Sequence, residues 1–307
     1  MRPLIRFYSS LLVLAGCLSA NSCSFRKPLV KPSRFDQNKA YSRLVELCSL
    51  GPRNNGSEGK TRAEHWIQQS LQNAGVEVTL HDFEYTGEGS QVIKFRNIVG
   101  RLNPKEPRRV LLGTHYDTRS KADRDPDESR RGQPIIGAND GASGVAVLLE
   151  LAALWKDRPP AVGVDFIFFD GEDFGSKDDL SDYFLGSKAY VRDYPDYRPE
   201  WGVVLDMVGD GDLRITKERF SLAQAPAVVE RLWNAARRVG ADGLVEQVGG
   251  RVYDDHSAFL DHGLPVVLLI DFHYQWFHTT GDTPDKCSPD SLGQVGRTVM
   301  EAVEAER

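Results

Sequence analysis

Apolar and polar residues form two kinds of pattern along this chain. Some segments have the apolar spacing of helices, and others have the alternation or the short apolar runs of strands. Helices are predicted where apolar residues recur every three or four positions, at about 35–47, 63–75, 144–155, 225–239 and 291–303. Strands are predicted at 76–83, 95–102, 110–114, 163–169, 202–208 and 265–270. We see no internal repeat and no change in composition that would mark a second domain.

The order of these elements predicts an α/β protein. Helices separate most of the predicted strands, and two strands are almost continuous apolar runs, as expected for strands buried on both faces. This pattern favours one mostly parallel, twisted central sheet with helices on both faces. We therefore expect a single domain over residues 36–307.

The N-terminus has the composition of an export signal. Two arginines precede an uncharged stretch that ends at Gly16, and Cys17 follows directly. A cysteine placed so closely after small residues resembles the lipid-attachment site of bacterial lipoproteins, although cleavage near Ala20 without lipid is an alternative. We expect a signal peptide at 1–16, a polar tether at 17–35, and an exported protein of the cell envelope. Its membrane contact would be through lipidated Cys17 alone.

Charge and cysteine content narrow the possible partners. The formal net charge of −6 gives no electrostatic basis for binding nucleic acid. Four cysteines do not form a disulfide framework, although Cys48 and Cys287 could pair in an oxidising envelope.

Acidic and histidine side chains stand at the ends of several predicted strands. His115 and Asp117 follow one strand, Glu172 and Asp173 follow another, and Asp206 lies near the end of a third. In parallel sheets, functional groups collect outside the carboxyl ends of the strands. The sequence therefore predicts that these side chains meet at one edge of the sheet.

Three residues could form a metal site there. Asp140, Asp173 and His278 would give three protein ligands and leave a fourth position for water or substrate, as catalytic zinc requires. Asp140 could instead be only a helix cap before the glycine-rich Gly141–Gly144 stretch, and His278 an ordinary surface histidine. A cap does not explain the other strand-end acids, which favours the metal site.

Glu172 is a candidate proton carrier. Neighbouring side chains at a strand end point in different directions, so Asp173 can bind metal while Glu172 faces the substrate. Nearby negative charges raise the pKa of a carboxylate, which suits proton transfer near neutral pH. The alternative is an exposed acidic turn. Ser143 does not have the spacing of a serine-hydrolase nucleophile elbow.

Taken in order, these motifs resemble the zinc-dependent M28 peptidase superfamily, and within it the glutaminyl-peptide cyclotransferases of bacterial envelopes. The similarity runs from about residue 36 to the C-terminus. The motifs are His115-Tyr116-Asp117, Asn139-Asp140-Gly141-Ala142-Ser143-Gly144, Gly171-Glu172-Asp173, Leu205-Asp206, Asp254-Asp255-His256 and His278-Thr279-Thr280-Gly281-Asp282.

The resemblance implies a role for each matching residue. One zinc ion would be held by Asp140, Asp173 and His278, and Glu172 would be the general acid and base. Asp206 and Asp255 would form a hydrogen-bonded acid pair, and Trp276 an aromatic wall of the substrate site. Here Phe277 lies between that tryptophan and the histidine, which departs from the animal enzymes.

The implied activity is conversion of N-terminal glutamine of peptides or proteins to pyroglutamate with release of ammonia. Asp173, where aminopeptidases usually have Glu, favours the cyclase. One alternative is a two-zinc aminopeptidase, in which His115 and Asp206 complete a second metal site. The other is a catalytically silent binding module on the same fold.

Overall fold

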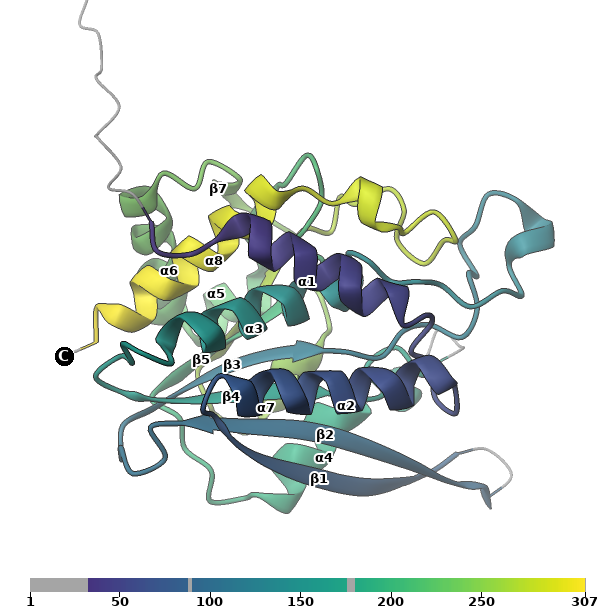
Figure 1. The fold of residues 1–307 in the computed structure, drawn as a ribbon, viewed down its shortest axis with the longest axis horizontal. Coiled ribbons are helices and arrows are strands. Elements are labelled where there is room, and N and C mark those ends of the chain that lie inside the picture. The colour runs from purple at the N-terminus through teal and green to yellow at the C-terminus, as the bar shows by residue number, and fades with distance from the viewer. Residues whose placement is uncertain (1–32, 88–89, 176–179, 307) are drawn as a thin grey trace, which may run out of the picture.

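The computed structural model of this protein describes residues 33–87, 90–175 and 180–306. The predicted signal peptide and the tether up to residue 32 lie outside the described residues. Within them, the protein forms one α/β domain with a central sheet flanked by helices, as predicted (Figure 1). Phe35 is already buried in the core, so the packed domain begins slightly before residue 36.

The central sheet of the described residues has six strands in the order β1-β2-β4-β3-β5-β8. β4, β3, β5 and β8 run parallel to one another, whereas β1 and β2 add an antiparallel edge. The sheet is therefore mixed, and its parallel part carries the site. The strands are β1 (Glu77–Thr86), β2 (Val92–Leu102), β3 (Arg109–His115), β4 (Gly163–Phe169), β5 (Trp201–Asp206) and β8 (Val266–Ile270).

Helices cover both faces of this sheet (Figure 1). α1, α2, α3, α6 and α8 pack on one face, and α4 and α7 pack on the other. The helices are α1 (Gln37–Ser49), α2 (Glu58–Asn73), α3 (Ala142–Trp155), α4 (Leu185–Asp193), α5 (Arg219–Gln224), α6 (Pro226–Val239), α7 (Asp255–Asp261) and α8 (Pro289–Glu304).

Successive residues of the parallel strands point into two separate cores. In β3, Val110 and Leu112 join the large core beneath α1, α3 and α8, whereas Leu111 joins the smaller core with Phe259 of α7. This two-residue alternation explains why the strands read as continuous apolar runs. Burial on both faces fixes the register of the strands and hence the positions of their ends.

Local signals set the helix ends that frame the site. Asp36 caps α1 by accepting hydrogen bonds from two backbone N–H groups, and Ser57 caps α2. Pro226 opens α6, and Gly240 ends it with a φ of 68°. Gly144 lets α3 approach the sheet, because a Cβ there would lie 2.1 Å from Oγ1 of Thr114.

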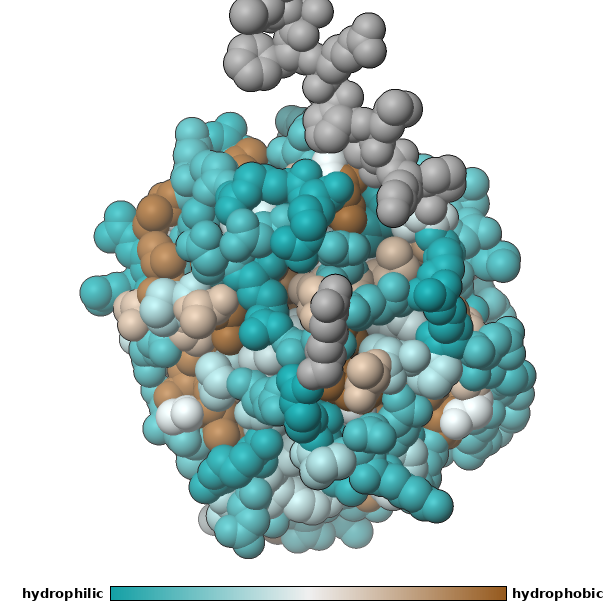
Figure 2. Space-filling model, turned by 90° about the vertical axis from the view of Figure 1, so that its left-hand side faces the viewer, coloured by the Kyte–Doolittle hydropathy of each residue, from teal (hydrophilic) through white to brown (hydrophobic). Residues whose placement is uncertain are grey.

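The structure adds short elements that were not predicted. α4 and α7 complete the second helical face, and β6 (Ile215–Lys217) pairs with β7 (Leu244–Val248) in a small separate sheet. No helix in the described part of the protein is long and apolar enough to cross a membrane. On the side of the molecule seen in Figure 2, hydrophilic residues cover most of the surface and apolar residues form small groups.

Candidate metal and catalytic site

The predicted convergence of side chains occurs at the carboxyl ends of the parallel strands. His115 ends β3, Glu172 and Asp173 follow β4, Asp206 ends β5, and His278 follows β8. With the exception of His115, these residues line a cavity of about 290 Å³, which also contains Asp140. All six residues are at least nine-tenths buried. The fold therefore brings together groups separated by up to 163 positions in the sequence.

Asp140 is held at the entrance to α3 by a second carboxylate. The carboxylate of Asp282 accepts hydrogen bonds from the backbone N–H groups of Asn139, at 2.8 Å, and Asp140, at 3.1 Å. Tyr274 donates its hydroxyl to the same carboxylate at 2.7 Å. Gly141 follows with a φ of 96°, and a Cβ there would lie 2.9 Å from the carbonyl oxygen of Asp117. The glycine-rich motif thus lets the backbone turn sharply behind Asp140.

Asp140, Asp173 and His278 have the arrangement of a metal site. Nε2 of His278 lies 3.2 Å from Oδ1 of Asp173 and 3.6 Å from Oδ2 of Asp140. Tetrahedral zinc with bonds of about 2.0–2.2 Å separates its ligand atoms by about 3.4 Å. Oδ2 of Asp140 and Oδ2 of Asp173 are buried without a hydrogen-bond partner among the described residues. Two carboxylates and one imidazole, with unpaired oxygens, suit a divalent cation.

Neighbouring charges hold this set in place. Nδ1 of His278 lies 3.5 Å from Oδ1 of Asp123, and Nη1 of Arg119 lies 3.7 Å from Oδ1 of Asp173. Burial alone would raise the pKa of Asp173, but His278 and Arg119 outweigh it and lower that pKa to about 2. His278 has a φ of 56°, a left-handed conformation that a residue other than glycine seldom adopts. Backbone strain of this kind is typical of functional sites.

A second set of possible ligands is His115, Asp140 and Asp206, whose ligand atoms lie within 4.8 Å of one another. Here Nε2 of His115 is 3.1 Å from Oδ1 of Asp206 and 3.2 Å from Oδ1 of Asp140. Burial alone would lower the pKa of His115, but Glu172 and the other carboxylates outweigh it and raise that pKa well above its usual range. The imidazole of His115 therefore lies in direct contact with two carboxylates.

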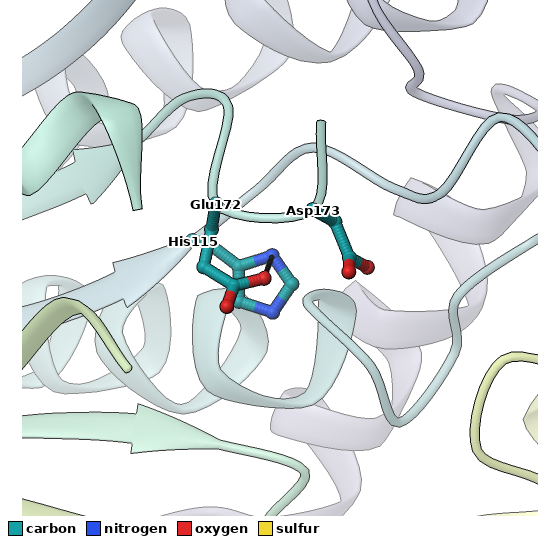
Figure 3. A group of neighbouring side chains, drawn as sticks. All are labelled: His115, Glu172 and Asp173. Atoms are coloured by element: carbon teal, nitrogen blue, oxygen red, sulfur yellow. Dashed lines mark ion pairs between the residues drawn. The ribbon is translucent and has the colours of Figure 1, made fainter. Parts of the chain in front are cut away.

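Glu172 and Asp173 point in different directions, as predicted. In Figure 3 the carboxylate of Glu172 lies against the His115 ring, at 3.9 Å from Nδ1, while Asp173 points to one side of it. Burial, followed by the charge of Asp173, raises the pKa of Glu172 well above its usual range. A raised pKa of this kind favours a role in proton transfer.

Asp117 positions both acids of this turn. Its two carboxylate oxygens accept hydrogen bonds from the backbone N–H groups of Glu172 and Asp173, each at 3.2 Å. The sequence placed Asp117 at a strand end without giving it a task. Its spacing from His115 was the available signal, because alternate residues of a strand point to the same side.

Of the two neighbouring acids Asp254 and Asp255, the one that lines the cavity is not the one predicted to pair with Asp206. Asp255 does not line the cavity, whereas its neighbour Asp254 does. Asp254 precedes α7 as its N-cap and has an extended backbone, and Asp255 is the first helical residue and is fully buried. Burial, followed by the charge of Asp206, raises the pKa of Asp254 well above its usual range.

The aromatic side chain that lines the cavity is also one position away from the predicted one. Phe277 lines the cavity, but Trp276 is not among the lining residues. The Trp276 ring lies beneath the ammonium group of Lys286, 4.9 Å from the ring centre, and packs against the smaller core. The phenylalanine that separates the tryptophan from His278 thus takes the place next to the metal set.

The structure records Cys48 and Cys287 as buried free thiols, so it contains no disulfide between them. Burial raises the pKa of the Cys48 thiol to about 12, and the pKa of Cys287 is raised further by the same cause. Both thiols therefore remain protonated at neutral pH and behave as small apolar core residues.

The fold and the site define an α/β protein with a buried group of acidic and histidine residues that could bind a metal. The chain belongs to peptidase family M28, whose family model matches residues 97–303.

Similar proteins fall into two functional groups. A glutaminyl cyclase of Tannerella forsythia is 33% identical, with a TM-score of 0.85 over 90% of this chain and 100% of the other. A leucine aminopeptidase precursor of Bacteroides thetaiotaomicron is 31% identical, with a TM-score of 0.87 over 91% and 100%. The glutaminyl-peptide cyclotransferase of Bos taurus is 28% identical over 277 residues, or 78% of this chain and 75% of the relative.

Proposed function

We propose that this protein is a glutaminyl-peptide cyclotransferase with one zinc ion, held by Asp140, Asp173 and His278. The observation that carries the proposal is a pair of buried carboxylate oxygens beside His278. Oδ2 of Asp140 and Oδ2 of Asp173 both have no hydrogen-bond partner among the described residues, whereas the set of His115, Asp140 and Asp206 contains only one such oxygen, that of Asp140. A cation held by Asp140, Asp173 and His278 would satisfy both oxygens.

A single metal suits an intramolecular reaction. The α-amine of an N-terminal glutamine attacks the amide carbon at the end of the same residue's side chain, so no separate nucleophile has to be generated. The bound zinc would supply Lewis-acid polarisation of the oxygen on that carbon. A new bond from the α-nitrogen to this carbon closes the ring, the bond from the carbon to the amide nitrogen breaks, and ammonia leaves.

Glu172 is the proposed proton carrier of this reaction. It takes a proton from the attacking amine and returns it to the departing nitrogen, so the net proton balance is zero. Its pKa is raised well above the usual range by burial and by Asp173, so it takes up a proton at a higher pH than an ordinary glutamate does. Asp206 and Asp254 line the same cavity, and their negative charges contribute to that raised pKa. We assign the acid pair to Asp206 and Asp254 in place of the predicted Asp206 and Asp255.

A two-zinc aminopeptidase is the second candidate. It is favoured by the close approach of His115, Asp140 and Asp206 and by the similar aminopeptidase structure. Asp140 would then be shared by both ligand sets, and Glu172 would activate water for hydrolysis. Peptides starting with glutamine would then release a free amino acid, and not ammonia.

The discriminating experiment measures zinc content and products on one preparation. We expect about one zinc per protein molecule, ammonia release from a Gln-initiated dipeptide, and loss of both in Asp140→Ala. Two zinc ions per molecule with release of free amino acids would establish the aminopeptidase instead. A folded protein that holds no divalent ion would rule out both.

We also propose that the protein is exported and anchored by lipid at Cys17, on the strength of its N-terminal sequence. Mass spectrometry of the N-terminal peptide from native membranes should find a diacylglyceryl group on that cysteine. Recovery of the protein in the soluble envelope fraction, with an N-terminus near residue 20, would contradict the anchor.

A further inference from the structure

The cavity has a negative floor and a positive mouth. Its floor carries five carboxylates, from Asp140, Glu172, Asp173, Asp206 and Asp254. Arg124 and Arg251 line the same cavity, and both residues are exposed to solvent. They come from different loops, Arg124 from the charged segment after β3 and Arg251 from the loop between β7 and α7.

Within the described residues, these two guanidinium groups are free of acidic partners. Among the described arginines, only Arg124, Arg158 and Arg251 make neither an ion pair nor a side-chain hydrogen bond. Arg124 lies over the Phe277 ring, 4.7 Å from its centre, and Arg251 lies over the Phe220 ring at 5.6 Å. Asp123, next to Arg124, is already paired with Arg119 at 2.6 Å.

Aromatic support leaves both charges available to a ligand. A ring beneath a guanidinium restrains its position without neutralising it. Two of the three unpaired arginines of the described residues therefore border one cavity, although most of the other arginines pair with a carboxylate. Exposed Tyr253 and Phe272 lie on the same border and offer apolar contact.

The polarity of the cavity orients a peptide. Its volume of about 290 Å³ is at the low end of the range for small-molecule sites, so it encloses a terminal residue and not a long segment. The amino terminus is drawn to the carboxylates of the floor. The residues that follow the N-terminal glutamine then leave through the mouth, past Arg124 and Arg251.

We infer that the mouth selects peptides and proteins with aspartate or glutamate directly after the N-terminal glutamine. This inference rests on the proposed cyclase function and adds a substrate class to it. Exposed ion pairs contribute only a small free energy of binding. We therefore expect each arginine to give about a 1.5- to 5-fold preference for an acidic peptide. Because the charges are exposed, the preference weakens as salt increases.

The test compares Gln-initiated pentapeptides that carry two glutamates, two glutamines or two lysines at positions two and three. We expect kcat/KM for ammonia release to be about tenfold higher for the glutamate peptide than for the lysine peptide at low salt, with similar kcat. The double variant Arg124→Gln/Arg251→Gln should bring this ratio close to one. Arg158→Gln removes an equally unpaired, exposed charge that does not line the cavity, and should leave the ratio unchanged.

A second readout separates this inference from the proposed chemistry. Binding of the corresponding pyroglutamyl pentapeptides, measured by calorimetry, should show the same acidic preference and the same loss in the double variant. No ammonia release from any peptide would refute the cyclase, and the binding ratio would still report on the mouth. A ratio near one in the parent protein, or one that survives in the double variant, would overturn the inference.

Discussion

Asp282 holds the backbone of Asp140 in place. The Asp282 carboxylate accepts a hydrogen bond from the backbone N–H of Asp140 at 3.1 Å, although Asp282 lies 142 positions later in the sequence. Thus the C-terminal loop that contributes His278 also fixes the first predicted metal ligand. The contact links two proposed metal ligands, Asp140 and His278, through the backbone and does not depend on an ion.

Asp282→Asn should weaken zinc binding, because the amide NH2 of asparagine would face a backbone N–H and leave a buried donor unsatisfied. Loss of such a supporting contact typically costs about 10- to 100-fold in metal affinity. Competition with a chelator measures the dissociation constant. Asp285→Asn is the matched control, since that side chain is 67% exposed in the same loop. Equal affinities for the two variants would deny Asp282 a positioning role.

Glu172→Gln and Asp173→Asn should separate proton transfer from metal binding, although the residues are adjacent. The first variant should keep zinc and lose at least about 100-fold in kcat, the scale of acid–base catalysis. The second should lose zinc, because an amide is a poor replacement for a carboxylate ligand. Zinc content and ammonia release, measured on the same samples, show whether the two residues have separate roles. Near-normal turnover of Glu172→Gln would remove that residue from the proposed role.

Gly144→Ala should destabilise the protein without touching a ligand. The new Cβ would lie 2.1 Å from Oγ1 of Thr114 and 2.7 Å from the carbonyl oxygen of Leu205, so helix α3 would have to move away from the sheet. Such overpacking costs about 1–3 kcal/mol of unfolding free energy, which urea denaturation resolves. At Gly132 the same substitution meets no atom within 4 Å and should be close to neutral. Equal urea midpoints for the Gly144→Ala and Gly132→Ala variants would show that the close approach of α3 to the sheet does not affect stability.

Glu218→Gln should remove a pH-dependent part of the stability. Glu218 is buried, lies 3.3 Å from Nε2 of His256, and accepts backbone N–H groups that include that of Val252. Burial alone would raise its pKa, but the nearby imidazole of His256 and the backbone N–H groups of Ser221 and Phe220 outweigh burial and lower the pKa to about 2. A depressed folded-state pKa stabilises the protein above the unfolded value of 4.5, and that contribution disappears as the pH falls from 4.5 towards 2.

The difference in unfolding free energy between parent and Glu218→Gln should therefore be largest near neutral pH and shrink through this window. Urea titrations from about pH 7 to about pH 2.5 measure it. A difference that stays constant with pH would mean that the contacts of Glu218 do not depend on its charge.

The sequence predicted the central sheet because the strands are buried on both faces, and burial leaves a clear apolar pattern. It did not predict α7, which has seven residues, or the β6–β7 pair. Elements this short depend on tertiary contacts, and propensity alone is a weak guide to them.

The sequence predicted the kind of site correctly, but it was less accurate about which residues line the site. Strand ends are well defined, so His115, Glu172, Asp173 and Asp206 could be expected to meet. The Asp254-Asp255 pair lies at a loop-to-helix junction, where moving by one residue turns a side chain from the cavity into the core. Which of two neighbouring acids faces the cavity depends on backbone dihedral angles that residue types alone do not specify.

The shared support of Glu172 and Asp173 by Asp117 limits how this protein can change. Both residues are attached to one turn by two adjacent backbone contacts, so any insertion or deletion between positions 170 and 174 would displace the proposed cation ligand and the proposed proton carrier together. Variation in this turn should therefore be confined to side-chain replacement at constant length.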